Sequence, residues 1–303
     1  MASRIKAIAP ASVANIGCLF DAAAMAVEAF RDTVLVEETV GGDVQVEAKG
    51  PVPSGRSNVA YKAAVYFLER LYGRLTGVRV IVEKGIPVAA GLGSSGATAA
   101  ATVAALNELL GIGASTGDLI EAAGEGEALA AGSRHYDNVA ASLLGGVVLV
   151  DPQNPRTYAL IRPPRSLRVV LFVKTLDVRE KTSFMRRLLP RTVGLGEASR
   201  WALAAAMLTL GLSVGDERYI AYASMGGPVE KARSRVIRNY WRAKEEALKA
   251  GAIAFNLSGA GPSMFALAKD DVASLVAERV LAVIDGYELV ITGINMNGVV
   301  IED

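Results

Sequence analysis

The sequence is poor in the two side chains on which many active sites depend. It has one cysteine, Cys18, and one histidine, His135, among 303 residues. A single cysteine excludes an internal disulfide framework and a multi-cysteine metal site. Because the chain also has only one histidine, a serine-hydrolase triad or a His-rich zinc site cannot easily be assembled either. We therefore expect a cytoplasmic protein whose function depends on neither a serine-hydrolase triad nor a zinc site.

An excess of either charge and a long apolar run are also missing. Lysine and arginine total 32 against 31 acidic residues, so no global field attracts nucleic acid or a membrane surface. The longest apolar run, Val139 to Val150, is interrupted by Gly145 and Gly146 and falls short of the roughly 20 residues that span a bilayer. We expect a small-molecule partner, with no nucleic acid and no membrane.

The chain is rich in core material, because hydrophobic residues make up 51% of it. Valines at alternate positions predict strands around residues 34–36, 44–46 and 78–82, and a helix capped by Ser57 is expected to end near Gly73. Prolines between residues 152 and 164 then interrupt the pattern. We predict an α+β protein with domains at residues 1–163 and 164–303, the second a sheet with helices on one face.

A glycine-rich segment from Pro87 to Thr98 follows a predicted strand and opens an alanine-rich helix. Glycines allow close approach of a ligand to the backbone, and the N–H groups at a helix start favour phosphate. The Gly-Lys-Ser/Thr ending of a Walker A loop is absent, so a different phosphate-binding fold is needed. An ordinary strand-to-helix turn is the alternative reading of this segment.

The next predicted helix carries a carboxylate on its apolar side. Glu127 falls on the same arc as the apolar residues, whereas Glu121 and Glu125 lie opposite. A buried carboxylate needs a cation, and Mg²⁺ carried by a nucleotide would serve. The alternative is a carboxylate that reaches out to solvent. Downstream, His135 lies in a polar cluster, and we expect it to have a supporting role.

Three segments resemble, in this order, the three motifs of the GHMP kinases: Pro10 to Asp21, Pro87 to Thr98 and Leu257 to Ser263. Within that superfamily, the segment His135 to Ala140 is most similar to the homoserine kinases. The resemblance implies a two-domain fold, with an N-terminal mixed α/β ATP-binding domain and a ferredoxin-like C-terminal α/β sandwich. It also implies a homodimer that uses ATP and Mg²⁺ to phosphorylate the side-chain hydroxyl of homoserine, a step of threonine biosynthesis.

The resemblance also assigns roles to residues. The residues expected to bind the nucleotide are Asn58, Pro87, Gly91, Leu92, Gly93, Ser94, Ser95, Gly96, Ser258, Gly259 and Gly261. Those expected to bind the acceptor are Asn15, Asp21, His135, Asp137, Asn138, Arg186 and Arg233, with Arg235 and Arg238 as alternatives to the last. Ser95 and Glu127 would hold Mg²⁺, and the residues at the reaction centre would be Ser95, Glu127, Asn138 and Thr182.

The sequence departs from the pattern of the homoserine kinases at Ala141, where a proline is frequent, and in one longer segment. They usually read Gly-Pro-Gly-Phe-Asp where this chain has Gly17-Cys18-Leu19-Phe20-Asp21. Two other functions therefore stay open: a kinase of the shikimate or mevalonate type, and a catalytically silent protein that binds ATP and a metabolite. Two acidic and two basic residues placed for an amino acid favour homoserine.

Overall fold

The amino-terminal part of the chain is built on a mixed sheet. The computed structural model describes residues 3–132, 134–175 and 181–302. The strands of this sheet are β1 (Arg4–Ala14), β2 (Ala23–Glu38), β3 (Val44–Lys49), β4 (Val78–Glu83), β5 (Val147–Asp151), β6 (Asn154–Ile161) and β11 (Val300–Glu302). Their order is β11-β1-β2-β4-β3, and β5 pairs with the first residues of β2 and with β6. All pairs are antiparallel except β3 with β4.

The predicted strands around Val34, Val44 and Val78 are confirmed. In β2 the side chains of Asp32, Val34 and Val36 are buried at every second position, as one inward face of a strand requires. The long β1–β2 pair changes register between Pro10 and Ala11. Beyond this irregularity β2 exchanges β4 for β5 as its second neighbour, so one strand connects two parts of the sheet.

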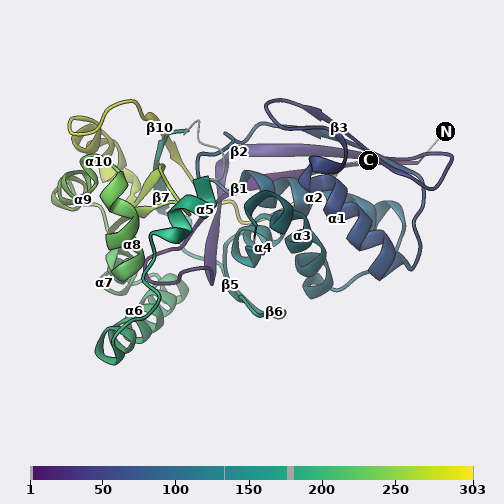
Figure 1. Ribbon diagram of the computed structural model, residues 1–303. Helices are drawn as coiled ribbons and strands as arrows, with labels where there is room; N and C mark the ends of the chain where they lie inside the picture. Colours follow the sequence, from purple (N-terminus) through teal and green to yellow (C-terminus); the bar gives the residue numbers. More distant parts are fainter. Residues whose placement is uncertain (1–2, 133, 176–180, 303) are drawn as a thin grey trace.

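Four helices cover one face of this sheet (Figure 1). They are α1 (Val59–Phe67), α2 (Ser94–Leu109), α3 (Thr116–Ala131) and α4 (Tyr136–Leu144). Helix α2 packs on β1 and β2 and also contacts the other three helices, which explains why its alanines are buried. The expected cap at Ser57 is wrong: Asn58 caps α1, because its Oδ1 accepts from Ala60 N at 2.9 Å.

The carboxy-terminal part contains a second, antiparallel sheet with the order β10-β7-β9-β8. Its strands are β7 (Leu167–Val173), β8 (Ala254–Leu257), β9 (Met264–Lys269) and β10 (Glu288–Thr292). The helices are α5 (Lys181–Arg187), α6 (Leu195–Val214), α7 (Glu217–Ile220), α8 (Gly227–Arg233), α9 (Tyr240–Lys249) and α10 (Asp270–Leu281). Phe172 and Phe255 pack with Tyr240 and Val276 of α9 and α10 on one face. The other face, with Leu171, joins the core of the first part.

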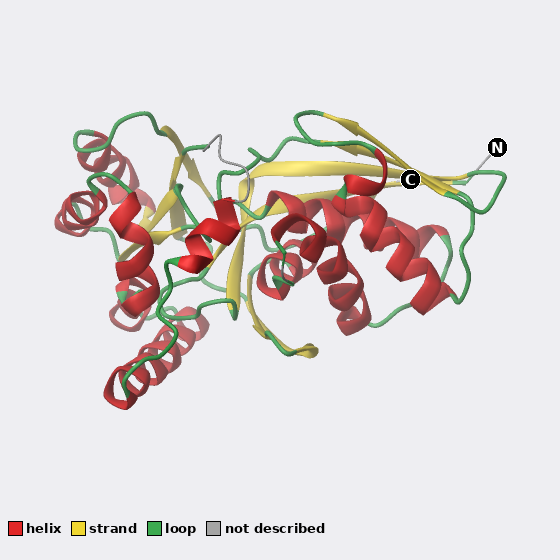
Figure 2. Ribbon diagram, in the orientation of Figure 1, coloured by secondary structure: helices red, strands yellow, loops and turns green. Residues whose placement is uncertain are grey.

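The two parts are joined by more than one passage of the chain. Strand β11, close to the last described residue, pairs with β1 of the first sheet rather than with the second. The N and C marks therefore lie at the same end of the molecule (Figure 1). Figure 2 shows the helices gathered in two groups, one along the long strands of the first sheet and one around the second. Among the described residues, no helix combines the length and apolarity needed to cross a membrane.

Candidate active site

A cavity of about 640 Å³ opens where the two parts of the chain meet. This volume is typical of a site for a small ligand. Its walls include many of the residues singled out in the sequence: Asn15, Asp21, Asn58, Pro87, Gly91, Leu92, Gly93, Ser94, Ser95, Glu127, His135, Asp137, Asn138, Arg186, Arg233 and Gly259. Gly96, Ser258 and Gly261 are not among the described lining residues. The side chain of Thr182 lies outside the described residues.

The glycine-rich segment forms the turn that leads into α2. Gly93 is the residue before the helix and has φ +66°, in the left-handed region that glycine adopts without strain. A Cβ at this position would collide with Ser12 Oγ and would lie 2.8 Å from Asn138 Oδ1. The first turn of α2 carries Ser94 and Ser95 and no acidic residue, so its N–H groups present an uncompensated positive end to the cavity.

The segment around Ser258 supports this turn from the second part of the chain. Ser258 is fully buried, and its Oγ donates to Gly91 O at 2.6 Å. Gly259 N donates to Ala14 O at 3.0 Å, which ties the same segment to the end of β1. A Cβ at Gly91 would lie 2.5 Å from Ser258 O, so the two loops are packed backbone against backbone. Ser258 therefore contributes to the cavity indirectly, because its hydrogen bond to Gly91 holds the glycine-rich turn in place.

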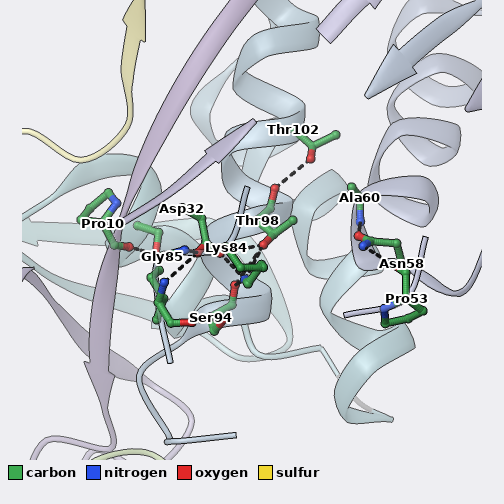
Figure 3. Close-up of polar contacts among 12 residues, drawn as sticks. Pro10, Asp32, Pro53, Asn58, Ala60, Lys84, Gly85, Ser94, Thr98 and Thr102 are labelled. Atoms are coloured by element: carbon green, nitrogen blue, oxygen red, sulfur yellow. Dashed lines mark hydrogen bonds and ion pairs between the residues drawn. The ribbon is translucent and has the colours of Figure 1, made fainter. Parts of the chain in front are cut away.

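A buried ion pair beside the cavity was not anticipated from the sequence. Lys84 Nζ pairs with Asp32 and donates to Ser94 O at 2.9 Å and to Thr98 Oγ1 at 2.8 Å (Figure 3). Asp32 Oδ1 also accepts from the N–H groups of Gly85 and Ile86, each at 3.0 Å. Burial lowers the pKa of Lys84, and the charge of Asp32 opposes that change. The pair fixes both the start of the glycine-rich segment and the first turn of α2.

A signal for this pair was present in the sequence. Asp32 stands in register with Val34 and Val36 on the inward face of β2, where an acidic side chain needs a partner. Lys84 follows the last residue of β4 and lines the cavity together with Thr98. The partner could not be identified from the pattern, because the pair joins residues 52 positions apart.

Asn58 lies at another wall of the cavity, at the start of α1. Its Oδ1 caps the helix, and its Nδ2 donates to Pro53 O at 2.7 Å (Figure 3). Both ends of the side-chain amide therefore have protein partners. Val52, Pro53 and Val59 also line this wall, and they give it an apolar surface that the sequence had not indicated.

Glu127 points inward, as the helical arc predicts. It is 5% exposed and lines the cavity. Its Oε1 lies 3.4 Å from His135 Nδ1, and its Oε2 is buried without a hydrogen-bond partner among the described residues. An orphaned carboxylate oxygen is costly unless a cation meets it. Together with the hydroxyl of Ser95 on the same cavity, this oxygen suits a hard cation such as Mg²⁺, which prefers oxygen ligands.

His135 connects two of the charged groups. Arg186 Nη2 lies 2.8 Å from its Nε2, and Glu127 Oε1 lies near its Nδ1. Burial opposes a charge on the ring, but Glu127, Asp137 and Asp21 together raise the pKa of His135. Because Arg186 stays protonated, Nε2 must accept from it, so in this arrangement the neutral ring carries its proton on Nδ1, toward Glu127.

Asp137 and Asn138 occupy the first turn of α4. Asp137 is 1% exposed, and its Oδ1 accepts from Asn138 N at 2.8 Å. Burial raises the pKa of Asp137 to about 6, although the nearby His135 opposes this. Asn138 Oδ1 accepts from Ser12 Oγ at 2.9 Å, which links α4 to β1 beside the glycine-rich turn. Asn138 therefore lies between the predicted phosphate and acceptor ends of the cavity.

The loop between β1 and β2 has a strained backbone. Asn15 and Asp21 have φ values of +60° and +53°, and Gly17 has +61°. Asn15 Oδ1 accepts from Asp21 N at 2.9 Å and so closes the loop. Asn and Asp tolerate the left-handed region better than other side chains. Cys18, which departs from the family pattern, has its Sγ 3.4 Å from Trp201 O of α6.

Two arginines from the second part of the chain reach the same end of the cavity. Arg186 of α5 forms an ion pair with Asp21, with Nη2 2.8 Å from Oδ2. Arg233 of α8 is 3% exposed and donates from Nη1 to Gly259 O at 2.8 Å. Burial lowers the pKa of Arg233 to about 10. The Nε atoms of both arginines are buried and lack a hydrogen-bond partner among the described residues, so one donor of each guanidinium group is unsatisfied.

Comparisons with known proteins match both parts of the chain to domains of one family. The GHMP kinases N terminal domain matches residues 58–146, and the GHMP kinases C terminal domain matches residues 203–285. The homoserine kinase of Pyrobaculum aerophilum is 39% identical over 90% of this chain and 91% of its own length. That of Pyrobaculum neutrophilum is 40% identical over 86% and 87%.

A solved structure extends the similarity to the whole fold. The homoserine kinase from Cytophaga hutchinsonii superposes with a TM-score of 0.89 and 32% identity, covering 99% of this chain and 97% of that one. The matched regions contain the glycine-rich turn, Glu127 and the α4 segment in the first part, and Arg233 and the Ser258 loop in the second. On these sequence matches and this shared fold, the chain belongs to the GHMP kinase family.

Proposed function

We propose that the chain transfers the γ-phosphoryl group of ATP to the side-chain hydroxyl of L-homoserine. One observation carries the choice of acceptor: two carboxylates, Asp21 and Asp137, and two arginines, Arg186 and Arg233, line one end of the cavity. An amino acid brings an ammonium and a carboxylate, and these four side chains match both charges. The relatives named homoserine kinase support the same choice.

The other end of the cavity suits the nucleotide. The glycine-rich turn, from Gly91 to Gly96, and the start of α2 would surround the phosphates, with Lys84 beside them. Asn58 and Pro87 would border the rest of the nucleotide, and Gly259 with the supporting Ser258 and Gly261 would close the site from the second part of the chain. Ser95 and Glu127 would hold Mg²⁺, which neutralises phosphate charge when bound.

Phosphoryl transfer depends mainly on positioning and charge neutralisation. Asn138, between the two ends of the cavity, would orient the acceptor hydroxyl toward the phosphate. Asp137 would bind the ammonium, because Asp21 is already paired with Arg186. The guanidinium groups of Arg186 and Arg233, which line the cavity, would bind the carboxylate. Thr182 would lie near the transferred group, as the family resemblance implies.

The test is a panel of hydroxylated acids and amino acids assayed with ATP and Mg²⁺. Homoserine should give the highest kcat/KM, and removal of either its amino or its carboxyl group should lower this value. A preference for shikimate or mevalonate would assign the chain to another branch of the family. ATP binding without phosphorylation of any acceptor would indicate a regulatory protein.

We also propose that the chain forms a homodimer, and that α6 contributes to the contact. This helix has no charged residue between Arg200 and Asp216, yet Leu203, Leu210 and Val214 are exposed on it. Leu210→Glu should shift the mass measured by light scattering toward the monomer. Leu75→Glu is the matched control, because Leu75 and Leu210 are both 46% exposed and Leu75 lies far along the chain in the first part.

A further inference from the structure

Phe20 touches both arginines of the acceptor end of the cavity. The Cζ atom of Arg186 lies 5.6 Å from the centroid of the Phe20 ring, and that of Arg233 lies 5.2 Å from it. Both distances are within the range of cation–π contacts. The ring belongs to the loop between β1 and β2, whereas the arginines belong to α5 and α8. One side chain of the first part therefore meets two cations of the second.

The arrangement places two like charges close together, and the Phe20 ring lies within cation–π distance of both. Arg233 is almost fully buried, and the neighbouring Arg186 adds to the cost of its charge. The negative face of an aromatic ring stabilises a guanidinium without occupying its N–H donors. A carboxylate in the place of Phe20 would pair with those donors and block them. The ring can thus stabilise both cations without forming hydrogen bonds to their Nε atoms, which are buried and have no partner among the described residues.

The ring itself is held by a preorganised loop. The hydrogen bond from Asp21 N to Asn15 Oδ1 closes the loop, and Phe20 N donates to Cys18 O at 2.9 Å. A Cβ at Gly17 would lie 2.8 Å from Ala223 O, so this loop is packed directly against the second part of the chain. A ring on such a loop has a defined position relative to α5 and α8.

We propose that Phe20 is a positioning residue that aligns the guanidinium groups of Arg186 and Arg233 for the carboxylate of the acceptor. The role rests on the proposed function, because it takes these two arginines as the groups that bind that carboxylate. Loss of the aromatic face should misalign the arginines and weaken acceptor binding. The phosphates and the acceptor hydroxyl are held by other residues, so the chemical step should change little.

The experiment compares Phe20→Leu and Phe20→Met, which keep an apolar side chain but remove the ring, with Phe20→Tyr, which keeps the ring. For both ring-less variants, KM for homoserine should rise by about tenfold, with kcat within about twofold and KM for ATP unchanged. Phe20→Tyr should restore KM to near the wild-type value. Phe184→Leu makes the same change on α5, the helix of Arg186, and should leave KM unaltered. Thermal melting identifies a variant that fails to fold.

A second readout needs no acceptor. Phenylglyoxal modifies accessible guanidinium groups, and peptide mass spectrometry can follow Arg186 and Arg233 separately, with the exposed Arg187 as an internal reference. Both arginines should be modified several times faster in Phe20→Leu and at the wild-type rate in Phe20→Tyr. If the wild-type enzyme does not use homoserine but the labelling changes as expected, the proposed acceptor is wrong and the positioning role stands.

Two kinetic results would overturn the inference. One is a wild-type KM for homoserine in both ring-less variants of an active enzyme. The other is a Phe20→Tyr variant as impaired as Phe20→Leu, because that would assign the effect to packing rather than to the aromatic face. Unchanged labelling of both arginines in Phe20→Leu would likewise reject it, whatever the acceptor is.

Discussion

Asp21 and Arg186 form an ion pair between the loop after β1 and helix α5, with Oδ2 2.8 Å from Nη2. This pairing leaves Asp137 as the carboxylate at the acceptor end that has no cationic side chain bonded to it among the described residues. If Asp137 binds the ammonium of homoserine, as we propose, the charge that it offers depends on whether its carboxyl group is ionised. Because burial raises the pKa of Asp137 to about 6, its ionisation changes within the pH range in which many enzymes work.

The pH dependence of the reaction should reveal this group. With its pKa raised to about 6, Asp137 is charged above that pH and loses its charge below it, where an ordinary aspartate would stay ionised. We expect kcat/KM for homoserine to fall below about pH 6, approaching tenfold per pH unit. KM for ATP should show no such change. His135→Ala should keep this acid limb, whereas Asp137→Asn should remove it at a lower plateau; a flat profile down to pH 5 would contradict the assignment.

Glu127→Gln should leave the fold intact and remove most of the activity. The substitution replaces the orphaned carboxylate oxygen with a neutral amide, which is a poor ligand for Mg²⁺. Loss of this ligand should lower kcat by roughly 10³-fold or more. Glu125→Gln is the control on the same helix, because Glu125 already has a cationic partner, the exposed Arg134, with Nε 2.6 Å from Oε1. Near-normal turnover of Glu127→Gln at saturating Mg²⁺ would show that this carboxylate is structural.

His135 and Asn138 should separate binding from chemistry. His135 contacts Arg186, so His135→Ala should raise KM for the acceptor. Asn138→Ala should lower kcat more severely, because Asn138 would orient the hydroxyl and also bonds Ser12 beside the glycine-rich turn. Steady-state kinetics with homoserine varied at saturating ATP measures both effects. A His135→Ala enzyme with normal KM but a loss of more than about 10³-fold in kcat would identify a general base.

The sequence predicted the strands with alternating valines and the inward direction of Glu127, because both follow from a fixed repeat of the backbone. It did not predict that Lys84 pairs with Asp32 or that Asp21 pairs with Arg186. Each of these contacts joins segments whose proximity depends on how strands and helices pack in three dimensions, and no local repeat encodes that. The motifs predicted residues that the structure brings together around one cavity, but the structure was needed to show which of their charged side chains already have partners.

The Lys84–Asp32 pair should contribute to both stability and nucleotide binding. Asp32→Asn leaves a buried ammonium without its counter-charge and should cost about 3–5 kcal/mol of stability. The double variant Asp32→Asn/Lys84→Met should recover much of that loss of stability, because it removes the unpaired charge. We expect KM for ATP to be raised by about tenfold in the double variant, because Lys84 no longer lies beside the phosphates. Lys62→Met, at a more exposed lysine, is the control. Chemical denaturation and ATP kinetics of the single and double variants measure the two effects, and a double variant no more stable than Asp32→Asn would contradict the explanation.

The pairing of β11 with β1 has a consequence for how the protein is made. Lys6 and Glu302, whose side chains are bonded at 2.7 Å, are 296 positions apart in the sequence. Until β11 has been synthesised, the edge of β1 that it covers has unpaired N–H and C=O groups. A ribosome therefore exposes the first sheet and its four covering helices with an open sheet edge for as long as the second half of the chain is being translated. Closure of the first sheet is in this way delayed until the acceptor end of the cavity has also been produced.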